Sequence, residues 1–113
     1  MNREAFEAIM AAARQQLSAG DVSAAFAQLE RAHVIGQGRF VPHLRSHLGM
    51  LRVAWILKDG RELRGQLLRI ALVPIGHLTG RLPPGNTVGA NVSALRAMPI
   101  APDLQCLIDK GQR

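Results

Sequence analysis

The sequence predicts an all-α protein of antiparallel helical hairpins, and three observations support this fold class. Ala, Leu and Gln are frequent, and these residues favour helix. Apolar residues recur at intervals of three and four along residues 1–78, with capping and stop residues that divide them into four segments. Val, Ile and Thr form no alternating apolar and polar run, so no strand is expected.

The first two helices are defined by their ends. The first is expected over residues 3–19, because Asn2 can cap its start and Gly20 stops it. Its apolar stripe consists of Phe6, Ile9, Met10, Ala13 and Leu17. The second helix follows Asp21, a further capping residue, and extends over residues 22–35.

The third helix is expected over residues 42–58, with Pro42 in the first turn, where the missing N–H would have no helical partner. It has two apolar rows, which predict burial on two sides and a central position. The rows are Leu44, Leu48, Leu51 and Trp55, and His43, His47, Met50, Ala54 and Leu57. The fourth helix is expected over residues 61–76 after a turn at Asp59-Gly60, with Pro74 bending or ending it.

We expect the chain of 113 residues to form a single helical domain, residues 1–113. Within it, residues 1–78 form the hairpins, and residues 79–101, rich in Pro and Gly, form an irregular segment that wraps them. Residues 102–113 form a short helix and a tail. The Asn side chains in the loop Gly85–Ser93 are expected to hydrogen-bond to its own backbone, because the Lys-Ser/Thr step of a phosphate-binding loop is missing.

The net charge of +6 comes from twelve Arg and two Lys against eight acidic residues. Such a charge suits nucleic acid, but the arginines are scattered without interleaved aromatics, which favours a solvated helical surface. Arg61, Arg64 and Arg69 form the densest group and could meet an acidic protein partner. No apolar stretch is long enough to span a membrane and residues 1–20 lack the apolar core of a signal peptide, so we expect a cytoplasmic, bacterial protein.

Three of the four histidines lie within fifteen residues, and their spacing predicts a metal site. Glu30 and His33 are three residues apart, and His43 and His47 are four apart, so each pair shares a helix face. The break at residues 36–39 allows a hairpin turn that would bring the two pairs together. Three imidazoles and a carboxylate suit a borderline divalent ion, so the expected ligands of Zn(II) are Glu30, His33, His43 and His47.

The same histidines also allow a structural interpretation. His33 lies on the apolar stripe of its helix and would be a core imidazole bonded to a carbonyl oxygen, while His47 would pair with Glu30. The protein would then be a protein-interaction module whose groove and arginines engage a partner. Neither interpretation includes catalysis, because carboxylates are few and no Ser-His-Asp or Cys-His arrangement is present in the sequence pattern.

Two stretches of the chain resemble a known family. They are residues 29–37 with His43-Leu44-Arg45-Ser46-His47, and residues 85–93 with Met98-Pro99-Ile100. They are similar to a bacterial family of small helical proteins, the domain of unknown function 3703. The resemblance implies a compact helical protein and a setting beside metal-resistance or metal-transport genes, and it brings no established activity.

A second resemblance is to the tetratricopeptide repeat. Residues 20–32 are similar to the second half of such a repeat at Gly20, Asp21, Ala25 and Ala32, which implies closely paired helices. We therefore expect a small non-enzymatic metal-binding protein, accessory to metal homeostasis or resistance. The alternative is a tetratricopeptide-like protein-interaction module with structural histidines.

Overall fold

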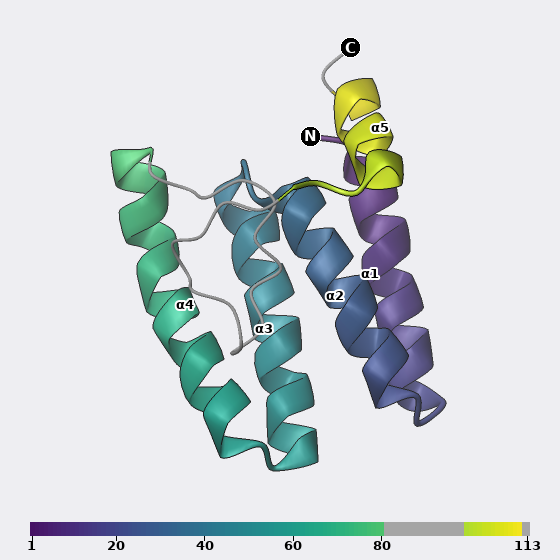
Figure 1. The fold of residues 1–113 in the computed structure, drawn as a ribbon, viewed down its shortest axis with the longest axis vertical. Helices are drawn as coiled ribbons and strands as arrows, with labels where there is room; N and C mark the ends of the chain where they lie inside the picture. Colours follow the sequence, from purple (N-terminus) through teal and green to yellow (C-terminus); the bar gives the residue numbers. More distant parts are fainter. Residues whose placement is uncertain (81–98, 112–113) are drawn as a thin grey trace.

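The computed structural model describes residues 1–80 and 99–111 of the chain (Figure 1). Within these ranges it contains helices and no strand, so the predicted all-α class is confirmed. The helices are α1 (Arg3–Ser18), α2 (Val22–Gly36), α3 (Phe40–Leu57), α4 (Gly60–Thr79) and α5 (Pro102–Gly111).

The first four helices lie in a row in chain order, and each runs antiparallel to the next (Figure 1). α1 packs on α2, α2 on α3, and α3 on α4, while α5 packs on α2 near the N-terminus. α2 and α3 therefore have helical neighbours on both sides, whereas α1 and α4 form the two edges of the row. This arrangement places the facing surfaces of α2, α3 and α4 around the histidines.

Short polar side chains begin three of the helices. Asn2, Asp21 and Asp59 each accept the backbone N–H three residues further along the chain, at 3.0–3.1 Å. Each bond satisfies one of the N–H groups that the first turn of a helix leaves without a helical partner. The predicted caps Asn2 and Asp21 are thus confirmed, and Gly20, with a φ of 83°, follows the end of α1.

Two expectations about the helices are wrong. The fourth helix, expected to end by residue 76, continues through Pro74 to Thr79. A proline removes only one helical hydrogen bond, and the neighbouring Val73, 1% exposed, holds this part of α4 in place by its burial. The row that contains Leu48 and Trp55 is not buried, since these side chains are 47% and 72% exposed. α2 and α4 pack against other sides of α3, so this row faces outward.

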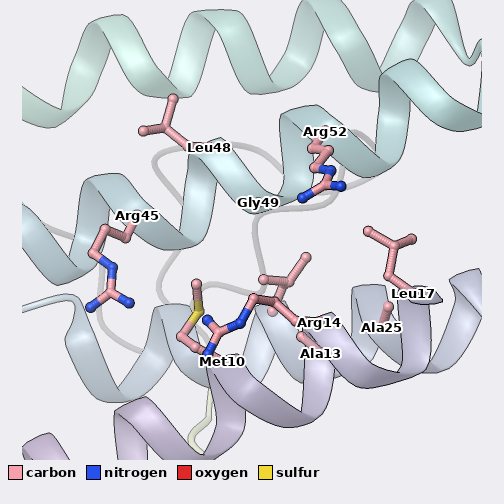
Figure 2. A pocket seen from close by; sticks show the side chains of 10 residues that line it. Met10, Ala13, Arg14, Leu17, Ala25, Arg45, Leu48, Gly49 and Arg52 are labelled. Atoms are coloured by element: carbon pink, nitrogen blue, oxygen red, sulfur yellow. The ribbon is translucent and has the colours of Figure 1, made fainter.

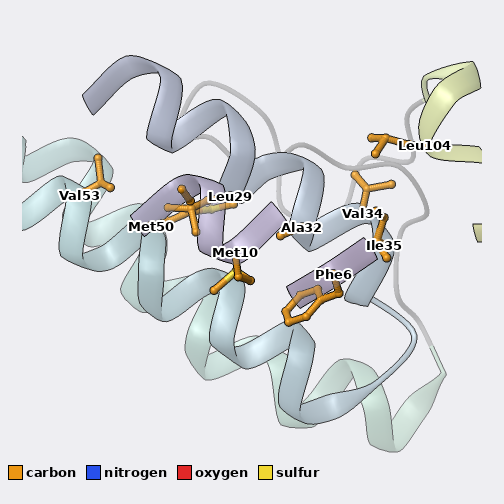
Figure 3. Close-up of a cluster of buried hydrophobic side chains, with 10 residues drawn as sticks. Phe6, Met10, Leu29, Ala32, Val34, Ile35, Met50, Val53 and Leu104 are labelled. Atoms are coloured by element: carbon orange, nitrogen blue, oxygen red, sulfur yellow. The ribbon is translucent and has the colours of Figure 1, made fainter. Parts of the chain in front are cut away.

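The hydrophobic core is formed mainly by α1, α2 and α3 (Figure 3). Its buried members are Phe6, Met10, Ala13, Leu29, Ala32, Val34, Ile35, Met50, Val53 and Leu104. Phe6 and Met50 have no exposed surface. Leu104 shows that α5, which extends to Gly111, joins this core.

The irregular segment predicted for residues 79–101 falls almost wholly on residues 81–98, which lie outside the described residues. The predicted loop Gly85–Ser93 lies there as well. The division of the chain into hairpins, wrap and tail therefore stays a prediction.

Gly36 makes the close approach of α1 and α3 to the end of α2 possible. A Cβ atom at this position would lie 2.9 Å from Phe6 Cε2 and 2.9 Å from Pro42 Cβ, closer than carbon atoms pack. We expect Gly36→Ala to lower the free energy of unfolding by about 1–3 kcal/mol, the usual cost of overpacking. Denaturant unfolding measures this loss.

The matched control is Gly38→Ala, two residues along the same connection. A Cβ atom there would have no heavy atom within 4 Å, and the φ of Gly38 is not positive. We expect its effect to stay within about 0.5 kcal/mol. Equal losses in the two variants would contradict the packing role of Gly36.

Candidate metal centre

Three neighbouring helices, α2, α3 and α4, place histidines at the same end of their length. His33 lies in the last turn of α2, and His43 and His47 lie in successive turns at the start of α3. Only three residues separate α2 from α3, so the end of one helix and the start of the next lie at a similar height. His77, from the last turn of α4, approaches the same place because α4 runs antiparallel beside α3.

The imidazoles of His33, His43 and His47 form a compact buried triangle, which we call the histidine cluster. Their ring centroids are 4.6 Å (His33 to His43), 4.7 Å (His33 to His47) and 5.0 Å (His43 to His47) apart. One ring nitrogen from each of the three lies within 4.8 Å of the others. The side chains are 1%, 5% and 2% exposed, so bulk water scarcely reaches them.

A continuous run of polar contacts crosses the cluster from one turn of α4 to another. His77 Nε2 lies 2.9 Å from His43 Nδ1, and His43 Nε2 lies 3.2 Å from His47 Nε2. His47 Nδ1 lies 3.0 Å from Gln66 Oε1, and Gln66 Nε2 donates to Glu62 Oε1 at 2.9 Å. The run thus begins at a half-buried histidine and ends at a carboxylate.

The carboxylate fixes the direction of every hydrogen bond in this run. An ionised Glu62 can only accept, so Gln66 donates its amide N–H and keeps its carbonyl oxygen for His47. His47 therefore carries its proton on Nδ1 and presents the lone pair of Nε2 to His43. A neutral His43 then donates from Nε2 and accepts from His77 at Nδ1. In the metal-free state, His47 already has the tautomer that a metal ligand needs.

Burial keeps the imidazoles of His43 and His47 neutral. It lowers the pKa of His43 from 6.5 to about 3, and the neighbouring His47 and His77 add to this effect by opposing a second positive charge. Burial also lowers the pKa of His47, more than the hydrogen bond with Gln66 raises it, and the charge of Arg69 lowers it further. Neutral imidazole is the form that binds metal ions, so the cluster is prepared for ligation at neutral pH.

The spacing of the ring nitrogens fits a tetrahedral ion. With Zn–N distances of about 2.0–2.1 Å, two ligand atoms of a tetrahedral site are about 3.3–3.4 Å apart. The Nε2 atoms of His43 and His47 are 3.2 Å apart, so they need almost no movement. One ring nitrogen of His33 lies within 4.8 Å of one ring nitrogen of His43 and one of His47, which is about 1.5 Å or less beyond the tetrahedral spacing.

The structure brings together three of the four residues that the sequence predicts for the site. The convergence of His33, His43 and His47 is confirmed, while their binding of a metal stays a prediction. The carboxylate of Glu30 does not belong to the group, and Glu30 is only half-buried. The expected pairing of His47 with Glu30 is wrong, because Nδ1 of His47 bonds to Gln66 instead.

His77 and Gln66 are the residues that the sequence analysis missed. Neither is close in sequence to the other histidines, and both reach them only because α4 packs along α3. One sequence signal could have indicated Gln66, a polar residue four positions after Glu62 and three before Arg69 on a helix otherwise rich in Leu and Ile. Arg69 is likewise 6% exposed, so the expected exposed group of three arginines on α4 is wrong for this member.

The fold and the site together define a small all-α protein with a buried cluster of histidines, open to ligation by a metal ion. Residues 1–108 match the family model described as Protein of unknown function (DUF3703), and the chain belongs to this family. Comparison with curated proteins gave no match. Comparison with solved structures also gave no match. Among the described residues, none of the helices combines the length and the apolar character that crossing a membrane requires.

Proposed function

We propose that this protein is a small non-enzymatic metal-binding protein that holds one divalent ion, Zn(II), on His33, His43 and His47. The single observation that supports this most is the burial of three imidazoles with ligand atoms within 4.8 Å of one another. Three neutral nitrogen ligands suit a borderline ion such as Zn(II), since hard ions such as Mg²⁺ prefer oxygen.

The surrounding side chains would orient the ligands. In proteins, a ligating histidine almost always donates its other N–H to an acceptor, which fixes the ring and its tautomer. Gln66 accepts from Nδ1 of His47. For His43 to ligate through Nε2, its proton must move to Nδ1, where Nε2 of His77 lies 2.9 Å away and becomes the acceptor. His77 can play either role, because a neutral imidazole has one donor and one acceptor nitrogen.

The fourth position of the ion would be taken by Glu30 or by water. Glu30 lies one helical turn before His33 on α2 and is half-buried, so a change of its side-chain rotamer is the movement that this role needs. With three protein ligands and water, the coordination would be the open type; with Glu30, it would be closed. We further propose a cytoplasmic accessory role in metal homeostasis or resistance, which a closed site with Glu30 as the fourth ligand would suit.

The test is metal stoichiometry in protein purified without an affinity tag. We expect one Zn(II) per chain by elemental analysis after loading and desalting, and none in His33→Gln. Gln retains much of the volume of the imidazole, so the variant separates ligation from packing. Loading that stays below one tenth of an equivalent in the wild type, or equal loading in His33→Gln, would reject the proposed function.

A further inference from the structure

A groove on another face of the molecule lies between α1 and α3 (Figure 2). We call it the α1–α3 groove. α1 contributes Met10 and Leu17 to one side, α3 contributes Leu48 to the other, and Ala25 and Leu29 of α2 form the bottom. Its volume is about 310 Å³, within the range of about 300–1,000 Å³ that small-molecule sites occupy.

Small residues line part of this groove. On α1 the groove residues recur at positions 10, 13, 14 and 17, and on α3 at positions 45, 48, 49 and 52, so each helix contributes one face about two turns long. Ala13 and Gly49 are the small members of these faces. A Cβ atom on Gly49 would lie only 2.7 Å from Leu29 Cδ2, so Leu29 occupies the space that a side chain would take.

Three arginines, and no acidic residue, lie among the groove residues. Arg14 comes from α1, and Arg45 and Arg52 come from α3 (Figure 2). Arg45 is neutralised by a bidentate ion pair with Glu7. Within residues 1–80 and 99–111, neither Arg14 nor Arg52 belongs to an ion pair, and both are exposed. The groove therefore combines an apolar interior with two guanidinium groups available at its rim.

The charge of the chain itself argues for an occupant from outside. Residues 81–98 contain Arg81 and Arg96 and no Asp or Glu, so they offer no carboxylate to the rim. A second copy has a net charge of +6, so its overall charge would oppose its approach to this rim. Neither residues 81–98 nor a second copy is thus suited to pair with Arg14 and Arg52. A guanidinium group binds a carboxylate through two parallel hydrogen bonds, so a ligand with a carboxylate suits this rim.

The volume of the α1–α3 groove sets the size of the apolar part of its ligand. An engineered cavity of about 150 Å³ holds a benzene molecule, and the groove has about twice that volume. We propose that the α1–α3 groove binds an amphipathic monocarboxylate of the fatty-acid class, with an apolar body of about ten to twelve carbons against Ala25 and Leu29 and its carboxylate on Arg14 or Arg52. This site is separate from the histidine cluster and does not depend on metal binding.

The probe is decanoate, titrated below its micellar concentration into the full chain and followed by amide chemical shifts and calorimetry. We expect saturable binding of one molecule per chain, with shifts concentrated on residues 10–17 and 45–52. Decyltrimethylammonium, which has the same chain and the opposite charge, should not bind.

The double variant Arg14→Gln with Arg52→Gln should weaken decanoate binding at least tenfold. The matched control removes the same charge elsewhere on the surface, by Arg61→Gln with Arg64→Gln, and should leave affinity within twofold.

Three outcomes would overturn this assignment. The first is no saturable binding of decanoate, or shifts that avoid both groove segments. The second is an equal loss of affinity in the two double variants, which would indicate general electrostatic attraction. The third is binding to vesicles of phosphatidylglycerol that requires Arg14 and Arg52 while free decanoate does not bind, which would indicate a membrane surface instead.

Discussion

Zn(II) should raise the melting temperature of the wild-type protein by about 10 °C at neutral pH, and His47→Gln should abolish this rise. An ion that binds only the folded state stabilises it by about 2.7 kcal/mol when free ion exceeds the dissociation constant a hundredfold. For a domain of this size, each kcal/mol corresponds to a shift of roughly 4 °C. Paired thermal melts with Zn(II) and with chelator measure the difference for each variant against its own metal-free state.

The choice of substitution matters because the ligands are buried. His47 is 2% exposed and bonded to Gln66, so truncation to Ala would leave a cavity and an unsatisfied amide oxygen. Gln retains volume and polarity, and the metal-dependent shift then reports ligation. His77→Gln, which alters the group beside His43, should reduce affinity about 10–100-fold and preserve a smaller shift at high Zn(II).

Cys106 provides the specificity control. Its thiol is exposed and lies on α5, so it could bind Zn(II) without reporting on the histidine cluster. Cys106→Ser should show the full wild-type shift. No shift in the wild type, or a shift that survives in His47→Gln but disappears in Cys106→Ser, would contradict the proposed site.

The metal-free protein should lose stability as pH falls from about 7 to about 5, by about 1 kcal/mol per pH unit below pH 6 from His43 alone. In the unfolded chain, histidine takes up a proton near pH 6.5. In the folded protein, burial and the neighbouring His47 and His77 lower the pKa of His43 to about 3. Between these values the unfolded state binds more protons, so its population grows as pH falls.

The range from about pH 7 to about pH 5 separates the contribution of the histidines to stability from that of the surface carboxylates. The pKa of Glu7 is also lowered, first by its hydrogen bond with Arg45, so this pair loses stability as pH falls as well. Its loss begins only below the unfolded pKa of 4.5, beneath the range used for the histidines. Chemical denaturation with chelator at several pH values between about 7 and 5 therefore measures the histidine contribution.

The control for pH dependence is His43→Gln with His47→Gln. Without these two groups, the slope of unfolding free energy against pH should become much shallower, since the pKa of His47 is lowered by burial as well. A wild-type stability that does not change between pH 7 and 5 would show that the buried imidazoles take up protons without cost. An unchanged slope in the double variant would assign the effect to other groups.

Local sequence information was sufficient to predict the helices and the convergence of the histidines on α2 and α3, but not the contribution of α4. The start of α1 and of α2 follows from Asn2 and Asp21, because a capping interaction involves residues only three positions apart. The convergence of His33 with His43 follows from the short connection between α2 and α3. In both cases the partners are close along the chain, so helix geometry alone decides whether they can meet.

Contacts between distant helices could not be predicted in the same way. Helical periodicity identified Leu48 and Trp55 as members of one face of α3, but it did not determine whether a neighbouring helix covers that face. The continuation of α4 past Pro74 was likewise not predictable from local sequence, since the local preference of proline is to interrupt a helix. The exposure of Leu48 and Trp55 is therefore set by how the helices pack in the row.

The sequence by itself determined that three histidines occupy facing turns of two consecutive helices, because the four-residue spacing of His43 and His47 and the short break after His33 are local properties. Only the tertiary structure decided what surrounds them. The packing of α4 along α3 brought His77 to His43 and Gln66 to His47, over separations of 34 and 19 residues. The packing of the helices also buried all three imidazoles, and this burial lowers the pKa values of His43 and His47. Desolvation arises from every element that covers a group, so no short segment of sequence contains it.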